Sequence, residues 1–334
     1  MLESLVWLLV GGAFLVLGGE VLVRGASGIA RLCRISPLII GLTIVAACTS
    51  APEMAVSLMG ALNGSDDVAL GNVVGSNIAN ILLILGLTAL ICPIAVSSRL
   101  IRREIPMMIG ISALTLLFSC VLCRGVEGAP DFHLFPRWGG GIFLILYFAY
   151  NFWILRTIHS DQDQKITDSL QENFQPRPAG SVFMQVSGFG TMLVLGLGML
   201  VFGADRFIFG GVKLAEILGV SQLVISLTIL AVGTSLPELV VSCVAAFRGK
   251  CDIAVGNLVG SNIFNLLAAL GLSASIHPVG LLMEDSVFRF DLPVMLGSAC
   301  VTALFCFTGR WLSRTEGVVL LLIYGGYLAF LVLR

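Results

Sequence analysis

The sequence predicts an all-α, polytopic membrane protein with ten transmembrane helices in two inverted five-helix repeats. Three observations predict this fold. Hydrophobic residues make up 57% of the 334 residues and charged residues only 12%, with a mean hydropathy of +1.00. Apolar runs of about 20 residues, the length of a helical bilayer crossing, recur along the whole chain. One segment occurs twice. This composition excludes a soluble enzyme, a disordered regulator and a secreted disulfide scaffold.

The apolar runs divide the chain into two halves. A membrane barrel would need short segments of alternating polarity, which the sequence lacks, so each run is expected to be a helix. We expect a first five-helix repeat at 1–158, a polar hinge loop at 159–180 and a second repeat at 181–334. The ten predicted spans are 3–24, 36–61, 66–92, 104–123, 137–157, 182–205, 221–246, 252–277, 288–308 and 312–333.

Positive charge in the connections predicts the orientation of the chain. Twelve Lys and Arg residues lie in the connections after the odd-numbered spans and five in the opposite connections. Because Lys and Arg accumulate on the cytoplasmic side, the sequence predicts a multi-pass cell-membrane protein with its hinge loop in the cytoplasm and both termini outside it. A net charge of −1 gives no reason to expect a nucleic-acid partner.

The internal repeat is the most informative feature. Leu42–Leu87 aligns with Leu227–Leu272 without a gap at an offset of 185 residues (227 − 42), and 26 of the 46 aligned positions are identical. The first copy, at about 36–92, contains LTIVAACTSAPE and GNVVGSNIAN; the second, at about 221–277, contains LTILAVGTSLPE and GNLVGSNIFN. Five spans separate the copies, so the second enters the membrane from the opposite side. Inverted repeats of this kind are typical of secondary transporters.

Each copy places one glutamate, Glu53 or Glu238, in the middle of an apolar span. A charge at that depth costs at least ~2.5–3.5 kcal/mol on insertion scales and usually marks an ion or proton pathway. The alternative is a protonated glutamate bonded to a neighbouring helix. Because both copies place the carboxylate within the same set of oxygen ligands, we favour an ion pathway.

The residues before each glutamate supply further oxygens. The proline in TS-x-PE cannot donate a backbone hydrogen bond and disturbs the preceding turn, which frees carbonyl groups toward the bundle interior. Broken backbone at this depth is tolerated where it lines a cavity or is buried in protein. Hydroxyls three and four residues before a glutamate share its helix face. The candidates are Ala46, Thr49, Ser50 and Glu53 in the first copy, and Ala231, Thr234, Ser235 and Glu238 in the second.

Spans 3 and 8 contribute a second set of polar groups. Ser76 and Asn80 are four residues apart on one helix face, and Ser261 and Asn265 repeat them. The alternative is that these groups only hydrogen-bond neighbouring helices together. Further amides lie beside that face, at Asn77 and Asn262, and a turn earlier, at Asn72 and Asn257.

The predicted ligands are all oxygens. Hard cations such as Ca²⁺ take six to eight oxygen ligands, whereas soft transition metals prefer His or Cys. The duplicated core contains no His, Lys or Arg at the shared positions, so an anionic substrate is not expected. The sequence therefore predicts a site for Na⁺, Ca²⁺ or a similar hard cation, with no catalytic residue and no resident cofactor, in a protein that is not an enzyme.

The duplicated motif also resembles a known family. G-x-T/S-x-P-E followed by G-N-x-x-G-S-N-x-x-N/D, present twice, is similar to the α-repeats of the calcium/cation antiporter superfamily, and most similar to those of prokaryotic Na⁺/Ca²⁺ exchangers. The resemblance implies that Glu53 and Glu238 are the central ligands for Ca²⁺ and Na⁺, with the hydroxyls, amides and Ala carbonyls named above as further ligands. It also implies that spans 1 and 6 are a long, tilted pair that slides across the others. One departure is Cys48, where relatives usually carry Gly.

The resulting expectation is a secondary active transporter that exchanges Ca²⁺ for Na⁺ by alternating access. Its expected partners are these ions and membrane lipid, and the sequence does not indicate an oligomeric state. Ca²⁺/H⁺ exchange at the same site is the nearest alternative, and a cation channel is a more distant one. A neutral Asn265 argues against K⁺ dependence, since K⁺-dependent relatives carry Asp at that position.

Overall fold

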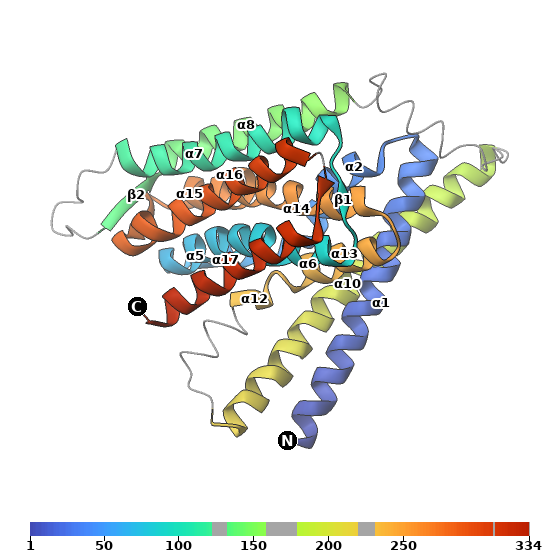
Figure 1. Cartoon of the computed structure of the whole chain (residues 1–334), viewed down its shortest axis with the longest axis horizontal. Coiled ribbons are helices and arrows are strands. Elements are labelled where there is room, and N and C mark those ends of the chain that lie inside the picture. The colour runs from blue at the N-terminus through green and yellow to red at the C-terminus, as the bar shows by residue number, and fades with distance from the viewer. Residues whose placement is uncertain (122–131, 158–178, 220–230, 310, 334) are drawn as a thin grey trace. The chain divides into compact units, whose positions relative to one another are not determined.

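The computed structural model describes residues 1–121, 132–157, 179–219, 231–309 and 311–333, and these are almost entirely helical (Figure 1). The helices are α1 (Leu2–Cys33), α2 (Pro37–Ile40), α3 (Ala46–Thr49), α4 (Ala51–Leu62), α5 (Asp66–Ile78), α6 (Leu85–Ile91), α7 (Ile105–Val121), α8 (Arg137–Arg156), α10 (Ala179–Ile217), α12 (Ala231–Gly233), α13 (Leu236–Phe247), α14 (Cys251–Phe264), α15 (Gly271–Ile276), α16 (Leu292–Gly309) and α17 (Arg314–Leu333).

Short π-helical turns and strands interrupt or join these helices. The π turns are η1 (Gly41–Val45), η2 (Ala79–Ile84), η3 (Leu100–Glu104), η5 (Asn265–Leu270) and η6 (Val287–Asp291). The strands are β1 (Ile94–Ala95), β2 (Phe132–Pro136), β3 (Gly280–Glu284) and β4 (Trp311–Leu312), which form two antiparallel pairs, β1 with β4 and β2 with β3. The sequence predicted neither the π turns nor the strands.

Each predicted membrane span that the structure describes in full corresponds to an apolar helix or to a bent helix pair. Within the described residues, eight continuous helices are long and apolar enough to cross a bilayer, and the bent pair Pro37–Thr49 and Ala51–Leu62 supplies a ninth if it counts as one span. The eight correspond to predicted spans 1, 3 to 6 and 8 to 10, and the bent pair corresponds to span 2. The start of predicted span 7 and most of the predicted hinge loop lie outside the described residues, so the count of ten stays a prediction.

Two predicted boundaries are wrong. Spans 1 and 6 were expected to end near residues 24 and 205, but α1 continues to Cys33 and α10 to Ile217. The charged residues at those points do not end the helix, because their side chains find local partners while the backbone ladder continues. Arg24 Nε lies 2.6 Å from Glu20 Oε1, one turn earlier on the same helix. The helix α1 ends at Arg34, which adopts the left-handed conformation and caps it.

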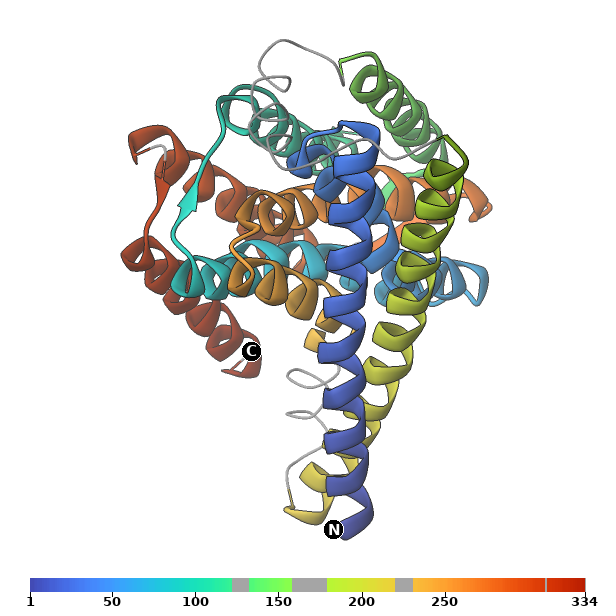
Figure 2. The same cartoon turned by 90° about the vertical axis from the view of Figure 1, so that its right-hand side faces the viewer.

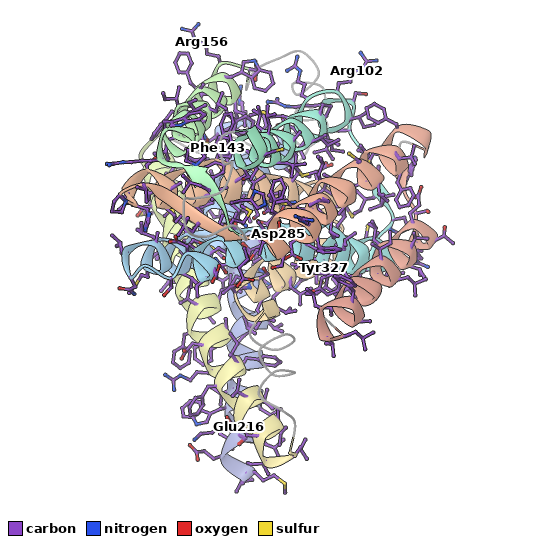
Figure 3. The ribbon with its side chains drawn as sticks, turned by 90° about the vertical axis from the view of Figure 1, so that its left-hand side faces the viewer. Arg102, Phe143, Arg156, Glu216, Asp285 and Tyr327 are labelled. Atoms are coloured by element: carbon purple, nitrogen blue, oxygen red, sulfur yellow. The ribbon has the colours of Figure 1, made fainter. Side chains whose placement is uncertain are left out.

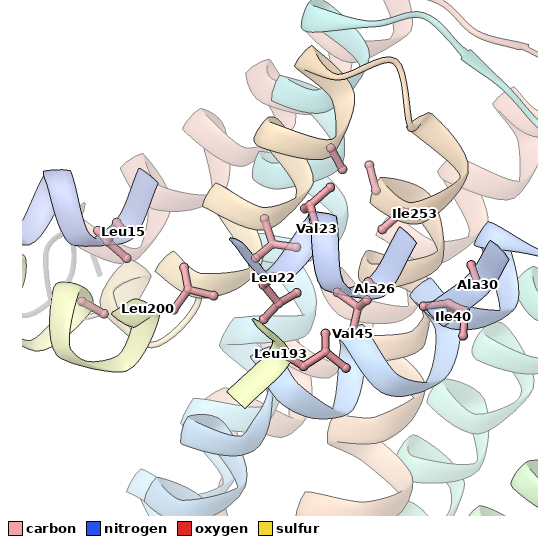
Figure 4. Packing of buried hydrophobic residues seen from close by; sticks show 14 residues of the cluster. Leu15, Leu22, Val23, Ala26, Ala30, Ile40, Val45, Leu193, Leu200 and Ile253 are labelled. Carbon is pink, nitrogen blue, oxygen red and sulfur yellow. The ribbon is translucent and has the colours of Figure 1, made fainter. Parts of the chain in front are cut away.

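The chain forms two compact units. One contains Met1–Thr49 and Asn151–Leu258, and the other contains Ser50–Tyr150 and Val259–Leu333. In the first unit, buried apolar side chains from α1, α10, α13 and the start of α14 form the core shown in Figure 4, with Leu22, Leu193 and Ile253 among them. The second unit packs α4 on α5, α6 on α17 and α7 on α16.

Glycines bring α1 and α10 into close contact within the first unit. Figures 1 and 2 both show the two helices side by side. A Cβ atom on Gly18 would lie 2.9 Å from Gly196 O, and the neighbours of Gly11 and Gly25 are Phe207 and Phe189, so the helices run antiparallel. The glycines occur every seven residues in each helix and match at the same offset of 185: Gly11, Gly18 and Gly25 on α1, and Gly196, Gly203 and Gly210 on α10.

The second unit repeats local features as well. The π turns η2 and η5 begin 186 residues apart, and η3 and η6 begin 187 apart (265 − 79 and 287 − 100). The last residue of η3 and of η6 is acidic, and its carboxylate accepts a hydrogen bond from a tyrosine hydroxyl. Tyr150 Oη donates to Glu104 Oε2 at 2.9 Å, and Tyr327 Oη, labelled in Figure 3, donates to Asp291 Oδ1 at 2.9 Å. The duplication therefore extends beyond the segments of high sequence identity.

Candidate cation-binding site

The helix break before each glutamate has the same form in both copies. In the first copy α3 ends at Thr49, Ser50 departs from helical geometry with φ −88° and ψ 4°, and α4 starts at a 46° bend. In the second copy Ser235 has φ −85° and ψ 8° before α13 starts. A proline occupies the first turn of each new helix, where its missing N–H costs nothing. The predicted proline-linked break is present in both copies.

Glu53 and Glu238 lie in the first turn of α4 and α13, and both are fully buried, with 0% of their surface exposed. The N-terminus of a helix carries a partial positive charge, so a carboxylate in the first turn is stabilised in its charged form by about 0.3–1 kcal/mol or more when buried. The break thus places each charge where the backbone itself favours an anion. Burial in turn removes the water that would otherwise compete for the carboxylate.

The first unit contains Ala46, Thr49, Ala231, Thr234, Ser235 and Glu238. Thr49 Oγ1 donates a hydrogen bond to Asn257 Oδ1 at 3.0 Å and lies 3.4 Å from Ala46 O. The helix α13 packs against α3, which brings the segment that carries Glu238 beside Ala46–Thr49. Ser235 is fully buried and Thr234 is partly buried. Ala231 opens α12, and no described contact tests the predicted role of its carbonyl.

The second unit contains Ser50, Glu53, Ser76, Asn80, Ser261 and Asn265, and all six are buried. The helix α4, which carries Glu53, packs against α5 and η5. Ser76 lies in α5, Asn80 in η2, Ser261 in α14 and Asn265 in η5. The fold thus brings the polar residues of spans 3 and 8 next to the helix of Glu53. Glu53 and Glu238 belong to different units, so their sharing of one ion stays a prediction.

Among the predicted uncharged ligands of the second unit, three oxygens are buried and have no hydrogen-bond partner among the described residues. They are Oγ of Ser76, Oδ1 of Asn80 and Oδ1 of Asn265. A buried polar atom without a partner costs about 1–3 kcal/mol, so each such atom calls for an explanation. A hard cation is the natural partner of an amide or hydroxyl oxygen, so these atoms fit the predicted ligand roles of their residues.

An amide–serine pair supports the broken span in each copy. Asn72 Nδ2 donates to Ser57 Oγ at 2.9 Å and to Glu53 O at 2.9 Å, and Asn257 Nδ2 donates to Ser242 Oγ at 3.1 Å. Ser57 and Ser242 were not among the residues predicted from the sequence. Their signal was available, since both serines match at the offset of 185 and lie one helical turn beyond the glutamates.

A known protein family matches both halves of the chain. The family model described as "Sodium/calcium exchanger protein" matches residues 3–156 and 189–333. A protein named putative antiporter CaxA from Alkalimonas amylolytica is 40% identical over 331 residues, which cover 98% of each chain. The sodium/calcium exchanger MaX1 of Methanosarcina acetivorans is 35% identical, with 97% of each chain covered.

Solved structures agree with these matches. A structure of the sodium-calcium exchanger NCX_Mj, soaked with zero Na⁺ and Ca²⁺, superposes with a TM-score of 0.79 at 28% identity and covers 100% of this chain and 99% of that one. The resemblance drawn from the two motifs is therefore confirmed. The family is one of transporters rather than enzymes, and the apolar helices make this chain a multi-pass membrane protein. The chain belongs to the sodium/calcium exchanger family.

Proposed function

We propose that the chain is an antiporter that exchanges Ca²⁺ for Na⁺ across a cell membrane by alternating access. The observation that carries the proposal is the duplicated break, which buries a carboxylate in the first turn of a helix in both copies. The proposed ligands are those predicted from the sequence, with Glu53 and Glu238 at the centre. Relatives whose names identify them as Na⁺/Ca²⁺ exchangers support the choice of ions.

Charge balance explains why such a site exchanges ions instead of leaking them. One Ca²⁺ neutralises two carboxylates, and so do two Na⁺; a third Na⁺ leaves the occupied site with a charge of +1. The empty site would carry two negative charges into a low-dielectric bundle, and desolvated charges without partners cost several kcal/mol each. The loaded forms can therefore change their access between the two sides, whereas the empty form is held back.

The opposite orientation of the two repeats in the membrane allows an outward-open and an inward-open state. If the halves exchange conformations, the site opens to one side and then to the other. The helices α1 and α10 pack antiparallel through glycines at equivalent positions, which supports this arrangement. We propose that these helices, spans 1 and 6, are the moving pair. Both termini are proposed to lie outside the cytoplasm, following the distribution of Lys and Arg.

The test is uptake of ⁴⁵Ca²⁺ into proteoliposomes loaded with Na⁺, with K⁺, or with acidic buffer. We expect uptake into the Na⁺-loaded vesicles and none above protein-free vesicles in the K⁺-loaded ones. Uptake driven only by the pH gradient would replace the proposal with Ca²⁺/H⁺ exchange. Flux that needs no counter-ion would indicate a channel.

A further inference from the structure

An asparagine can bind a cation only through one edge of its amide. The oxygen accepts, whereas the NH₂ group donates and repels a positive ion. Asn80 and Asn265 can therefore be ligands only if their NH₂ groups are held away from the ion. The contacts of two neighbouring amides, Asn77 and Asn262, show how this is done within the second unit.

The orientation of Asn262 is set by groups that cannot donate. Its Nδ2 atom lies 3.4 Å from the backbone carbonyl oxygen of Asn77 and 3.6 Å from Sδ of Met108. A carbonyl and a thioether only accept, so the NH₂ group of Asn262 must face them. Its oxygen then faces Asn80, whose Nδ2 donates to Asn262 Oδ1 at 3.1 Å.

Asn77 makes the equivalent contacts and accepts a hydrogen bond from Asn265. Asn77 Nδ2 lies 3.4 Å from the backbone carbonyl oxygen of Asn262 and 3.8 Å from Sδ of Met295. The oxygen of Asn77 therefore faces Asn265, whose Nδ2 donates to Asn77 Oδ1 at 3.3 Å. The asparagines of the two sets of contacts correspond at the offset of 185 residues that relates the two copies of the repeat.

Each set of contacts leaves one buried amide oxygen, Oδ1 of Asn80 or of Asn265, without a hydrogen-bond partner among the described residues. With their NH₂ groups occupied, Asn80 and Asn265 present Oδ1 atoms that have no hydrogen-bond partner in the described part of the chain. We propose that Asn77 and Asn262 are positioning residues, which fix the amides of Asn80 and Asn265 so that their oxygens, and not their NH₂ groups, meet the cation. This rests on the proposed function, in which Asn80 and Asn265 are cation ligands.

The proposal is tested by a double-mutant cycle on Ca²⁺ affinity. The four proteins are the wild type, Asn262→Leu, Asn80→Asp and the double variant, each purified in detergent and titrated with Ca²⁺ by calorimetry. Asn262→Leu removes the acceptor that holds Asn80, so its Kd for Ca²⁺ should rise about tenfold or more. A carboxylate binds a cation through either oxygen, so in the Asn80→Asp background the same change should alter Kd less than about threefold.

Three comparisons make the result decisive. Thr115→Val removes a buried hydroxyl whose bond lies within its own helix and should leave Kd at the wild-type value. The mirrored cycle, Asn77→Leu with Asn265→Asp, should show the same coupling. Asn262→Ser, whose shorter side chain does not reach Asn80, replaces Asn262→Leu if the latter does not give a monodisperse folded protein.

The outcomes separate this proposal from the one on which it rests. Wild-type protein that binds no Ca²⁺ would contradict the proposed function. If the wild type binds Ca²⁺ but Asn262→Leu weakens binding by the same factor in both backgrounds, the residue acts through packing alone and the positioning role is wrong.

Discussion

Glu104 is a buried carboxylate whose partners differ from those of a cation site. It is fully buried, it accepts a hydrogen bond from Tyr150 Oη at 2.9 Å, and its Oε1 lies 3.4 Å from Arg99 Nε. Arg99 is itself 9% exposed. A positive side chain and a phenol thus hold this charge, and the group links the start of span 4 to span 5.

Because Glu104 is held by protein groups, its removal should affect stability rather than ion binding. Breaking a buried ion pair from one side costs about 3–5 kcal/mol, whereas losing a hydrogen bond to a charged group costs about 1.5–3 kcal/mol. Glu104→Gln should therefore lower the thermal unfolding midpoint in detergent more than Tyr150→Phe does. The Kd for Ca²⁺ of the folded variants should stay at the wild-type value; a tenfold weakening would place Glu104 in the site.

The sequence indicated which residues of the two copies are equivalent, but not their contacts. Identity at a fixed offset predicts equivalent roles for Glu53 and Glu238, and likewise for Asn80 and Asn265. The structure places all four in buried positions. The sequence did not show that Asn80 donates to Asn262, because the orientation of an amide depends on which neighbours accept, and those neighbours come from other spans.

The elements show how close helix packing can be encoded by glycine. On α1, a Cβ atom at Gly18 would meet the backbone of α10 at 2.9 Å, whereas one at Gly12 would meet only the Phe207 ring at 3.8 Å. Small residues at such an interface let two helix backbones approach closely. The seven-residue spacing keeps the glycines on one face of each helix.

A pair of alanine variants tests this contact. Alanine favours a helix over glycine by about 1 kcal/mol, so Gly12→Ala should keep or raise the thermal unfolding midpoint. Gly18→Ala must push α1 away from α10, and we expect a lower midpoint and slower Ca²⁺ uptake despite the same gain in helix propensity. Equal behaviour of the two variants would show that the close approach does not matter.

Element boundaries were the least predictable feature. Hydropathy ended spans 1 and 6 at charged residues, yet α1 continues to Cys33 and α10 to Ile217. The charged side chains pair locally, Arg24 with Glu20 on α1 and Arg206 with Asp205 on α10. The π turns η2 and η5 were not predicted, because the apolar pattern of spans 3 and 8 does not distinguish a π turn from the α-helix on either side of it. The short strand pairs join residues from opposite halves of the chain, which no local pattern indicates.

At the scale of the whole molecule, one offset accounts for features in both units. Residues 185 apart supply the glutamates, the amide–serine pairs and the glycines of the long helices. An exchanger moves net charge across the membrane whenever the ions carried in one direction differ in total charge from those carried in the other. Exchange of one Ca²⁺ for three Na⁺ transfers one net positive charge in the direction of Na⁺ movement.

Membrane potential should therefore control the rate. One charge crossing 100 mV corresponds to about 2.3 kcal/mol. In Na⁺-loaded proteoliposomes, an inside-positive potential set with K⁺ and valinomycin should accelerate ⁴⁵Ca²⁺ uptake, because Na⁺ efflux carries the surplus charge outward. An inside-negative potential should slow it, and rates independent of potential would indicate a ratio of two Na⁺ per Ca²⁺.

The account depends most on the paired roles of Glu53 and Glu238. The most direct measurement is ⁴⁵Ca²⁺ uptake into Na⁺-loaded proteoliposomes containing Glu53→Gln or Glu238→Gln, beside Glu216→Gln, which changes an exposed carboxylate on α10 (Figure 3). We predict that both site variants fall to the level of protein-free vesicles while Glu216→Gln transports like the wild type. Uptake near the wild-type rate by either site variant would contradict the account.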